Sequence, residues 1–333
     1  MGLMPGDDPD AVAQAAATLR DGGLVAFPTE TVYGLGARAD SDVAVAAIFA
    51  AKGRPVNHPL IVHVVDAAAA LAFCGEPGAT ARHLMARHWP GPLTLIVPRR
   101  PGVAAAAAGG QPSIGLRCPA HPVAQALLRQ ALALGVPGVA APSANRFGRI
   151  SPTLASHVQQ EFGVALPVLD GGPCVVGIES TIVDCTRDPP ALLRPGGVVR
   201  AGLDATLAPL GLALREPDAA SPRASGTLAS HYAPSARLRL FDTDDLAAAL
   251  QALPPGAAGT VAVYSRQAPL AQALPGIAET RRMPDDAQAA AHELFAVLRA
   301  LDATGVSQIW VERPPSGAAW DGVNDRLRRA AAA

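Results

Sequence analysis

The spacing of apolar and polar positions divides residues 8–203 into helix-length and strand-length stretches. Asp8 and Ser41 stand at two predicted helix starts, and glycines follow the first helix where it stops. The strand-length runs are short, apolar and rich in β-branched residues, which is typical of buried strands. Helices are predicted over residues 8–20, 41–51, 78–88 and 122–134, and strands over 24–27, 60–65, 93–97, 113–117, 136–141, 164–169, 178–184 and 191–194. This mixed order indicates an α/β domain with a large, twisted, open mixed sheet.

The pattern loosens from about residue 203 to 235 into prolines, serines and glycines, the composition of a linker. Beyond it, strands are predicted over 237–241, 260–264 and 308–312, and helices over 244–253 and 285–303. Three regions follow: an α/β domain over 8–203, a linker over 204–235 and a smaller Rossmann-like α/β domain over 236–333. No G-x-G-x-x-G follows the first strand of the smaller domain, so dinucleotide binding is not supported there. The alanine run 104–108 indicates a surface loop or a short helix.

Composition bounds the class of protein. A chain of 333 residues, 50% of them hydrophobic, is long enough for two domains with sizeable cores. The net charge of −1 gives no overall attraction to nucleic acid or membrane. The four cysteines lie at irregular spacings without a C-x-x-C pair, so neither a zinc site nor a disulfide framework is indicated, and no disulfide-linked partner is expected. Without a signal-peptide pattern or an apolar run of about 18 residues, we expect a cytoplasmic protein that does not cross a membrane.

Lysine occurs only once among the 27 basic residues, at Lys52 in the tetrapeptide Lys-Gly-Arg-Pro. A compact ammonium differs from a guanidinium in size, hydration and donor geometry, so this exception suggests a contact to phosphate or carboxylate. The alternative is a cation at a helix C-terminus that interacts only with the helix dipole. Arg54 follows two residues later, and together the two could neutralise a triphosphate. His63 lies on the next predicted strand, where a half-buried structural histidine is the alternative to a ligand.

Polar residues gather where the predicted strands of the first domain end. The sequence Pro-Thr-Glu-Thr-Val-Tyr-Gly-Leu-Gly over 28–36 places hydroxyls, a carboxylate and a phenol in one loop, with glycines that let the backbone approach a ligand. Such loops bind ligands in α/β sheets, although a self-hydrogen-bonded turn is the alternative. The loop that contains Ser143 and Asn145 can offer N–H groups and hydroxyls to an anion. Ser113 and Arg117 are four residues apart on one strand and therefore face the same side.

These segments, taken in order, resemble the YrdC-type threonylcarbamoyl-AMP synthases. The resemblance rests on the 28–36 loop, Lys-x-Arg at 52–54, Pro-Leu-Ile-Val-His at 59–63, Ser-x-Asn at 143–145, Gly-Ile-Glu-Ser-Thr at 177–181 and Leu-Arg-Pro-Gly-Gly at 193–197. It covers roughly residues 10–203 and implies the YrdC-like α/β fold. The Ser-His-Tyr-Ala-Pro at 230–234 and the smaller terminal domain are similar to the long, two-domain form of the family.

The resemblance implies an enzyme, a nucleotidyltransferase whose substrates are L-threonine, bicarbonate and ATP. The threonine amine and bicarbonate form a carbamate, which attacks the α-phosphorus of ATP and releases pyrophosphate. No protein nucleophile is required, because nucleotidyl transfer depends on positioning and charge neutralisation. Mg²⁺ is the expected cofactor, held mainly by the ATP phosphates rather than by a protein cage. The product would pass to a downstream threonylcarbamoyl transferase complex that modifies the adenosine next to the anticodon of tRNA.

The resemblance also implies roles for individual residues. Lys52 and Arg54 are the expected catalytic residues. The expected ligands of L-threonine are Thr31, His63, Arg117, Ala141 and Ser180, with Arg117 placed to receive the carboxylate. The expected ligands of ATP are Arg54, His58, Ser113, Ser143, Asn145, Ser151, Arg194 and Tyr232.

Two departures from the family pattern bear on these roles. Many relatives have asparagine directly before the Pro-Leu-Ile-Val-His strand, whereas Asn57 and His58 precede it here, so either residue takes the nucleotide contact. The linker reads Ala-Ser-Gly at 224–226 where Ser-Pro-Gly is common. Closure of this linker over bound ATP, through Tyr232 or His231, is therefore a hypothesis.

Two other functions compete with the synthase. An RNA-binding module of the same fold, without catalysis, is one, although scattered arginines and few aromatic residues argue against it as the only function. A carbamoyltransferase that acts on carbamoyl phosphate is the other. Such proteins are expected to carry acylphosphatase and zinc-finger segments, and this sequence has neither.

Overall fold

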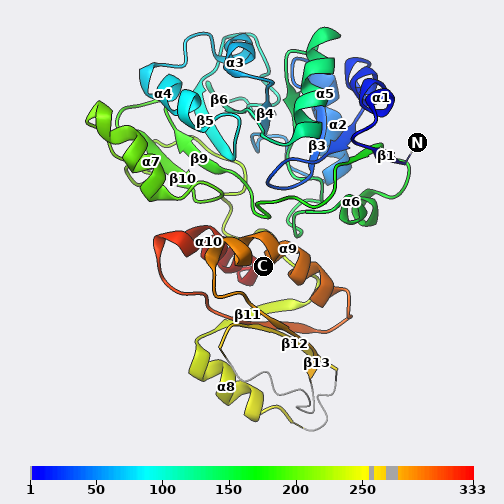
Figure 1. Cartoon of the computed structure of the whole chain (residues 1–333), viewed down its shortest axis with the longest axis vertical. Coiled ribbons are helices and arrows are strands. Elements are labelled where there is room, and N and C mark those ends of the chain that lie inside the picture. Colours follow the sequence, from blue (N-terminus) through cyan, green and yellow to red (C-terminus); the bar gives the residue numbers. More distant parts are fainter. Residues whose placement is uncertain (1, 255–258, 268–276) are drawn as a thin grey trace. The chain divides into compact units, whose positions relative to one another are not determined.

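The computed structural model of the chain describes residues 2–254, 259–267 and 277–333. The chain divides into two compact units (Figure 1). The first unit comprises Met1–Phe147 and Ser151–Thr227, and the second comprises Gly148–Ile150 and Leu228–Ala333. The predicted linker, residues 204–235, is thus divided between the two units.

The first unit is a mixed α/β structure built on one large sheet. Its helices are α1 (Pro9–Arg20), α2 (Asp42–Lys52), α3 (Ala67–Cys74), α4 (Ala79–His88), α5 (Pro122–Ala133), α6 (Ala155–Phe162) and α7 (Arg200–Leu207). Its strands are β1 (Leu3–Pro5), β2 (Val25–Phe27), β3 (Gly34–Arg38), β4 (Ile61–His63), β5 (Leu93–Pro98), β6 (Ser113–Arg117), β7 (Val139–Ala140), β8 (Val168–Asp170), β9 (Thr181–Asp184) and β10 (Ala191–Arg194).

The ten strands follow the order β1-β8-β2-β3-β7-β4-β6-β5-β9-β10. The sheet contains parallel pairs, such as β4 with β6 and β5 with β9, and antiparallel pairs, such as β3 with β7 and β5 with β6. The predicted open mixed sheet is therefore confirmed.

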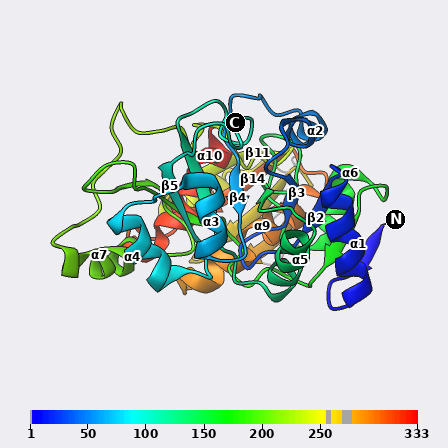
Figure 2. The same cartoon turned by 90° about the horizontal axis from the view of Figure 1, so that it is seen from above.

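Helices cover both faces of this sheet. On one face, α1 and α5 lie side by side and pack their apolar residues against Val25, Phe27, Val139 and Leu169 (Figures 1 and 2). The helices α2, α3, α4, α6 and α7 contribute to a larger core on the other side, which includes Leu35, Val62, Leu95 and Leu116. Since successive strand residues point to opposite faces, short strands that are apolar throughout can serve both cores.

Two sequence predictions are corrected in this unit. The second part of the 29–36 loop is not a loop, because β3 begins at Gly34 and pairs antiparallel with β2. The alanine run 104–108 is not a surface segment. Ala104, Ala107 and Ala108 are buried in a series of turns, where their small side chains allow close backbone packing.

The second unit contains a smaller sheet in which all four strands are parallel, in the order β11-β14-β12-β13. Its elements are β11 (Arg237–Phe241), α8 (Thr243–Gln251), β12 (Val261–Ser265), β13 (Ile277–Arg282), α9 (Ala287–Asp302), β14 (Gln308–Glu312) and α10 (Asp321–Ala331). Helix α8 lies on one side of this sheet, and α9 and α10 lie on the other (Figure 1). The predicted smaller Rossmann-like α/β unit is confirmed.

The carboxyl edge of the smaller sheet is filled by a side chain of the protein. The carboxylate of Glu312, which is fully buried, accepts hydrogen bonds from the backbone N–H groups of Arg266 (2.9 Å) and Gln267 (2.7 Å) and from the Ser265 hydroxyl. Ligands of parallel sheets bind at such edges. The N–H groups of Arg266 and Gln267 are thus bonded to Glu312 and are not available to a phosphate.

Within the described residues, no helix has both the length and the apolar character needed to cross a lipid bilayer.

Candidate active site

The expected threonine ligands His63 and Arg117 are brought together by strand register. Strands β4 and β6 are parallel, and His63 pairs directly with Arg117 at the carboxyl ends of both. On the other side of β4, His63 pairs with Val139, and the Ala141 N–H donates to the carbonyl of Ile61. The sheet therefore places three of the five expected threonine ligands on adjacent strands.

Arg117 is held by the loop that follows β2. Its Nη1 donates to the Thr31 hydroxyl at 2.8 Å and its Nε donates to the Gly91 carbonyl at 3.3 Å. Its Nη2 lies 2.8 Å from Oε1 of Glu30. Because both partners of this ion pair are almost completely buried, their attraction is weakly screened. The guanidinium is thus fixed at the end of β6, beside the hydroxyl of Thr31.

His63 is a neutral imidazole in this environment. Burial lowers its pKa from the usual value to about 3, and the positive charge of Arg117 acts in the same direction. The ring lies edge-on to Phe27, with 6.0 Å between the ring centroids. A neutral imidazole can accept or donate a hydrogen bond but cannot supply positive charge to the site.

His63 should make the protein less stable in acid. The folded state keeps His63 neutral, whereas the unfolded chain protonates it below about pH 6.5, so the free energy of unfolding falls as the pH drops through the window from about 6.5 to about 3. The slope from one such group is at most about 1.4 kcal/mol per pH unit. Denaturant unfolding of the wild type and of His63→Asn at pH 7 and pH 4.5 measures this loss of stability. The other histidines are common to both proteins, so the difference between the two losses reports His63. Equal losses of stability in the two proteins would contradict the assignment.

Lys52 is the last residue of α2, where Gly53 ends the helix in a left-handed conformation. A cation that interacts only with the helix dipole would point its ammonium into solvent, but the ammonium of Lys52 does not. It donates to the backbone carbonyls of Ser143 (2.6 Å) and Asn145, and it is buried. Burial lowers the pKa of Lys52 well below its usual value, with a smaller contribution from Arg54. Lys52 therefore fixes the loop that carries Ser143 and Asn145, both expected ATP ligands.

The Ser143–Asn145 loop is also tied to the 28–36 segment. The Ala144 N–H donates to the Tyr33 carbonyl at 2.8 Å, and Gly34 forms an isolated bridge with Ser143. A Cβ on Gly34 would stand 3.1 Å from the Cβ of Ala141, so glycine permits this close approach. Two motifs that are far apart in the sequence thus form one structure.

Arg54 and His58 share an aromatic neighbour. The guanidinium of Arg54 lies 5.8 Å from the ring centroid of Phe147, and the ring of His58 lies 5.4 Å from the same centroid. Asn57 is exposed, whereas His58 is partly buried. Burial and the charge of Arg54 lower the pKa of His58. His58 is therefore the member of the Asn57-His58 pair that lies beside Arg54, and its contact with nucleotide stays a prediction.

Arg54 and Arg194 converge on one residue, Ser225. Arg194 Nη1 donates to the Ser225 carbonyl at 2.8 Å, and Arg54 Nη2 lies 3.5 Å from its hydroxyl. Arg194 also donates to the Ser180 carbonyl, and the Ser180 hydroxyl bonds to that of Thr94 at 2.8 Å. Two guanidinium groups on a neutral residue form a positively charged region suited to phosphate.

The other expected ATP ligands of the first unit lie at separate places on its framework. The Ser151 hydroxyl donates to the buried carboxylate of Glu179 at 2.5 Å. Ser113 is buried at the start of β6, opposite Pro98, roughly 13 Å along the strand from Arg117. Ser113 and Arg117 face the same side but occupy opposite ends of the strand.

Tyr232 belongs to the second unit. It has a left-handed backbone (φ 65°) and a buried ring, which lies 5.4 Å from the ring of Phe295 and under the guanidinium of Arg326 at 5.3 Å. The neighbouring His231 N–H donates to the Arg329 carbonyl. The predicted closure over ATP stays a hypothesis.

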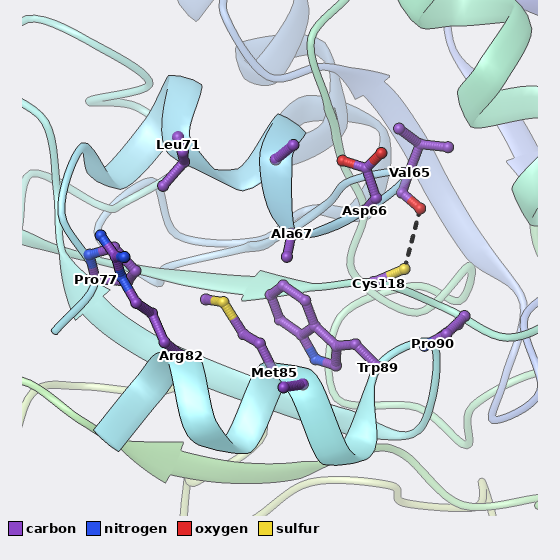
Figure 3. Close-up of a pocket in the computed structure, with 12 residues that line it drawn as sticks. Val65, Asp66, Ala67, Leu71, Pro77, Arg82, Met85, Trp89, Pro90 and Cys118 are labelled. Carbon is purple, nitrogen blue, oxygen red and sulfur yellow. Dashed lines mark hydrogen bonds between the residues drawn. The ribbon is translucent and has the colours of Figure 1, made fainter. Parts of the chain in front are cut away.

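A cavity of about 450 Å³ between α3 and α4 does not belong to this cluster. It is lined mainly by apolar side chains, among them Leu71, Met85 and Trp89, and it touches Cys118, the residue after Arg117 (Figure 3). The Cys118 thiol donates to the Val65 carbonyl, and burial raises its pKa to about 11. Since this thiol stays protonated near neutral pH, it is not an activated nucleophile.

Sequence reasoning gave no role to several polar residues of the cluster. Glu30, Glu179 and Ser225 were visible in their motifs, but their partners lie far away in the sequence. Thr94 had no signal beyond being a polar residue in an apolar strand. Over the residues that the structure describes, no three His, Cys, Asp or Glu side chains are arranged to hold a metal ion, and the expectation that Mg²⁺ comes with ATP stays a prediction.

Comparison with known proteins assigns the family of both units. Residues 17–196 match the Sua5/YciO/YrdC family model, described as "Telomere recombination", and residues 198–332 match "Threonylcarbamoyl-AMP synthase, C-terminal domain". The threonylcarbamoyl-AMP synthase of Bacillus subtilis is 44% identical over 71% of this chain and 68% of the relative. That of Pyrococcus abyssi is 36% identical over 95% of this chain and 92% of the relative.

A solved structure agrees with these matches. The crystal structure of Pyrococcus abyssi Sua5 complexed with L-threonine is similar with a TM-score of 0.86 and 34% identity, over 97% of this chain and 95% of the other. The order of motifs, the mixed sheet with its second parallel sheet and these matches lead to one conclusion. The chain belongs to the Sua5/YrdC family of threonylcarbamoyl-AMP synthases.

Proposed function

We propose that this chain is a threonylcarbamoyl-AMP synthase that uses L-threonine, bicarbonate and ATP. The observation that carries the proposal is the similarity to relatives of that name, at 36% identity over 95% of this chain and at 44% identity over 71% of it. The Pyrococcus abyssi structure that contains L-threonine supports threonine as the amino-acid substrate, since it is 34% identical to this chain. Two groups of residues in the first unit support the proposal, one suited to an amino acid and one suited to phosphates.

The first group suits threonine. Arg117 carries the positive charge that a carboxylate requires, and the Thr31 hydroxyl lies 2.8 Å from Nη1. The neutral His63 on the adjacent strand adds a hydrogen-bonding group without adding charge. These groups would orient the substrate so that its carbamate faces the nucleotide.

The second group suits the triphosphate. Arg54 and Arg194 converge on Ser225, and Lys52 fixes the Ser143–Asn145 loop. A fixed set of cations stabilises the charge that develops as pyrophosphate leaves, and no covalent enzyme intermediate is required. The reaction is thus a nucleotidyl transfer, with Mg²⁺ entering on the ATP phosphates. The product would serve a downstream transferase complex that acts on tRNA.

Pyrophosphate release from Mg-ATP and bicarbonate tests the proposal, with L-threonine, with L-serine and without an amino acid. We expect release that depends on both threonine and bicarbonate, together with a new adenylate that rapid chromatography separates. No turnover, with a salt-dependent shift of RNA in a gel, would instead favour the binding module.

A further inference from the structure

The carboxylate of Glu30 has no part in the roles described so far, yet it forms a buried ion pair with Arg117, an expected threonine ligand. We propose that Glu30 is a positioning residue for the substrate amino acid. It holds Arg117 against the Thr31 hydroxyl, which has already donated its proton to Thr29 and can only accept a hydrogen bond from the ligand. This proposal rests on the proposed function and specifies how its amino-acid site works.

Glu30 is enclosed behind Arg117. Its Oε1 lies 2.8 Å from Arg117 Nη2, and its Oε2 accepts the Ala120 N–H at 3.1 Å. Oε1 and Nη2 are both buried atoms, and the N–H direction at this contact departs from the line of a good hydrogen bond. Glu30 therefore acts on Arg117 chiefly through charge, and its enclosed oxygen acts on the substrate only through Arg117.

Two other donors of Arg117 are fixed in directed hydrogen bonds, which leaves further N–H groups for a ligand. Nε donates to the Gly91 carbonyl, and Nη1 donates to the Thr31 hydroxyl. Together with Glu30, these contacts restrain the guanidinium on three sides. Without the Glu30 carboxylate, the buried guanidinium of Arg117 would lose its counter-ion. It would then rotate towards other hydrogen-bond acceptors.

The hydrogen-bond donors and acceptors among the hydroxyls of Thr29 and Thr31, next to Arg117, can be assigned from their partners. Thr29 lies 2.7 Å from the Val32 carbonyl, which can only accept, so the single proton of Thr29 is used there. The 2.8 Å contact between the two hydroxyls then uses the proton of Thr31, and the Thr29 oxygen also accepts the backbone N–H groups of Thr31 and Val32 at the longer distance of 3.2 Å. Thr31 in turn accepts from Arg117 Nη1.

This order determines what a ligand meets at Thr31. The Thr31 proton is already donated, and one of its two oxygen lone pairs already accepts from Arg117. The lone pair that remains can only receive a donor. Threonine has two such donors, its ammonium and its side-chain hydroxyl, whereas its carboxylate is excluded from this position.

Glu30→Gln tests the positioning role. Arg117 and the Ala120 N–H are both donors, and the amide of the variant has only one acceptor oxygen. If that oxygen faces Arg117, the NH₂ group faces the Ala120 N–H, so the variant cannot satisfy both neighbours. We expect the Kd of L-threonine, measured by titration calorimetry, to rise at least tenfold. We also expect KM for ATP to stay within twofold of the wild-type value. The matched control is Glu76→Gln, which removes the acidic partner of an exposed Glu–Arg pair and should change neither constant.

A second variant keeps the proposal testable if Glu30→Gln does not fold. Thr31→Val retains the shape of the side chain without an acceptor, whereas Thr31→Ser keeps the hydroxyl. Threonine binding should weaken in the valine variant and recover in the serine variant. Unchanged threonine binding in Glu30→Gln or in Thr31→Val, or an equal rise in KM for ATP, would overturn the proposal. Wild-type protein that binds threonine without releasing pyrophosphate would contradict the proposed function instead, and the binding comparison would still decide the role of Glu30.

Discussion

Replacing Lys52 with alanine is expected to lower kcat/KM for threonylcarbamoyl-AMP formation by a factor of about 10² or more. The ammonium is buried and donates to the carbonyls of Ser143 and Asn145. Its removal would leave these carbonyls without their cation and would free the loop that carries two expected ATP ligands. Arg54→Ala should cause a loss of similar size, because it removes one of the two guanidinium groups at Ser225. Steady-state pyrophosphate release at varied ATP measures both losses.

The matched control for Lys52 is Arg146→Ala. Arg146 follows Asn145 directly, but its side chain is exposed and its guanidinium lies over the ring of Phe162. Since the exposed side chain loses only this ring contact and a long hydrogen bond of 3.5 Å to the Ala51 carbonyl, turnover should stay within twofold of the wild type. Near-normal turnover of Lys52→Ala would refute the catalytic role, and equal losses in Lys52→Ala and Arg146→Ala would indicate a general effect of charge near the loop.

The sequence predicted several elements closely. The helices α1, α2, α4 and α5 and the strands β6, β11 and β14 lie within a few residues of their predicted bounds. Other elements were missed, among them α3, although Asp66 caps it. Helix α3 is nearly all alanine and other apolar residues, so it has no polar face to give a period, and β1 has only three residues. The pairing of β1 with Val168 is a long-range contact that no local pattern encodes.

The candidate site shows the same division between local pattern and distant contact. The motifs identified the loops, because polar residues and glycines at strand ends are visible in any sequence. The bonds between those loops were not predictable. Lys52 was expected at a phosphate, yet its direct partners are the carbonyls of Ser143 and Asn145. Glu30 stood in a quoted motif without a role, since its partner Arg117 becomes its neighbour only when β6 joins the sheet.

Gly196→Ala is expected to destabilise the protein by about 3 kcal/mol, near the upper end for overpacking. A Cβ at this position would stand 2.3 Å from the Glu179 carbonyl oxygen and 2.6 Å from the backbone at Ser180 and Thr181. These atoms belong to the backbone beside β9, so a side-chain rotation cannot relieve the clash. The loop would have to move, and the Ser180 carbonyl that accepts from Arg194 would move with it.

The loss should therefore affect stability and ATP binding together. Thermal unfolding should show a Tm several degrees lower, and KM for ATP should rise because Arg194 loses its anchor. Gly202→Ala is the matched control, since the nearest atom to its added Cβ is 4.0 Å away and the residue lies inside helix α7. Alanine favours the helix there, so this variant should gain about 0.5–1 kcal/mol. If Gly196→Ala has the same Tm as the wild type, the 179–181 backbone can shift without a loss of stability. The Leu-Arg-Pro-Gly-Gly motif would then need glycine for a reason other than this contact.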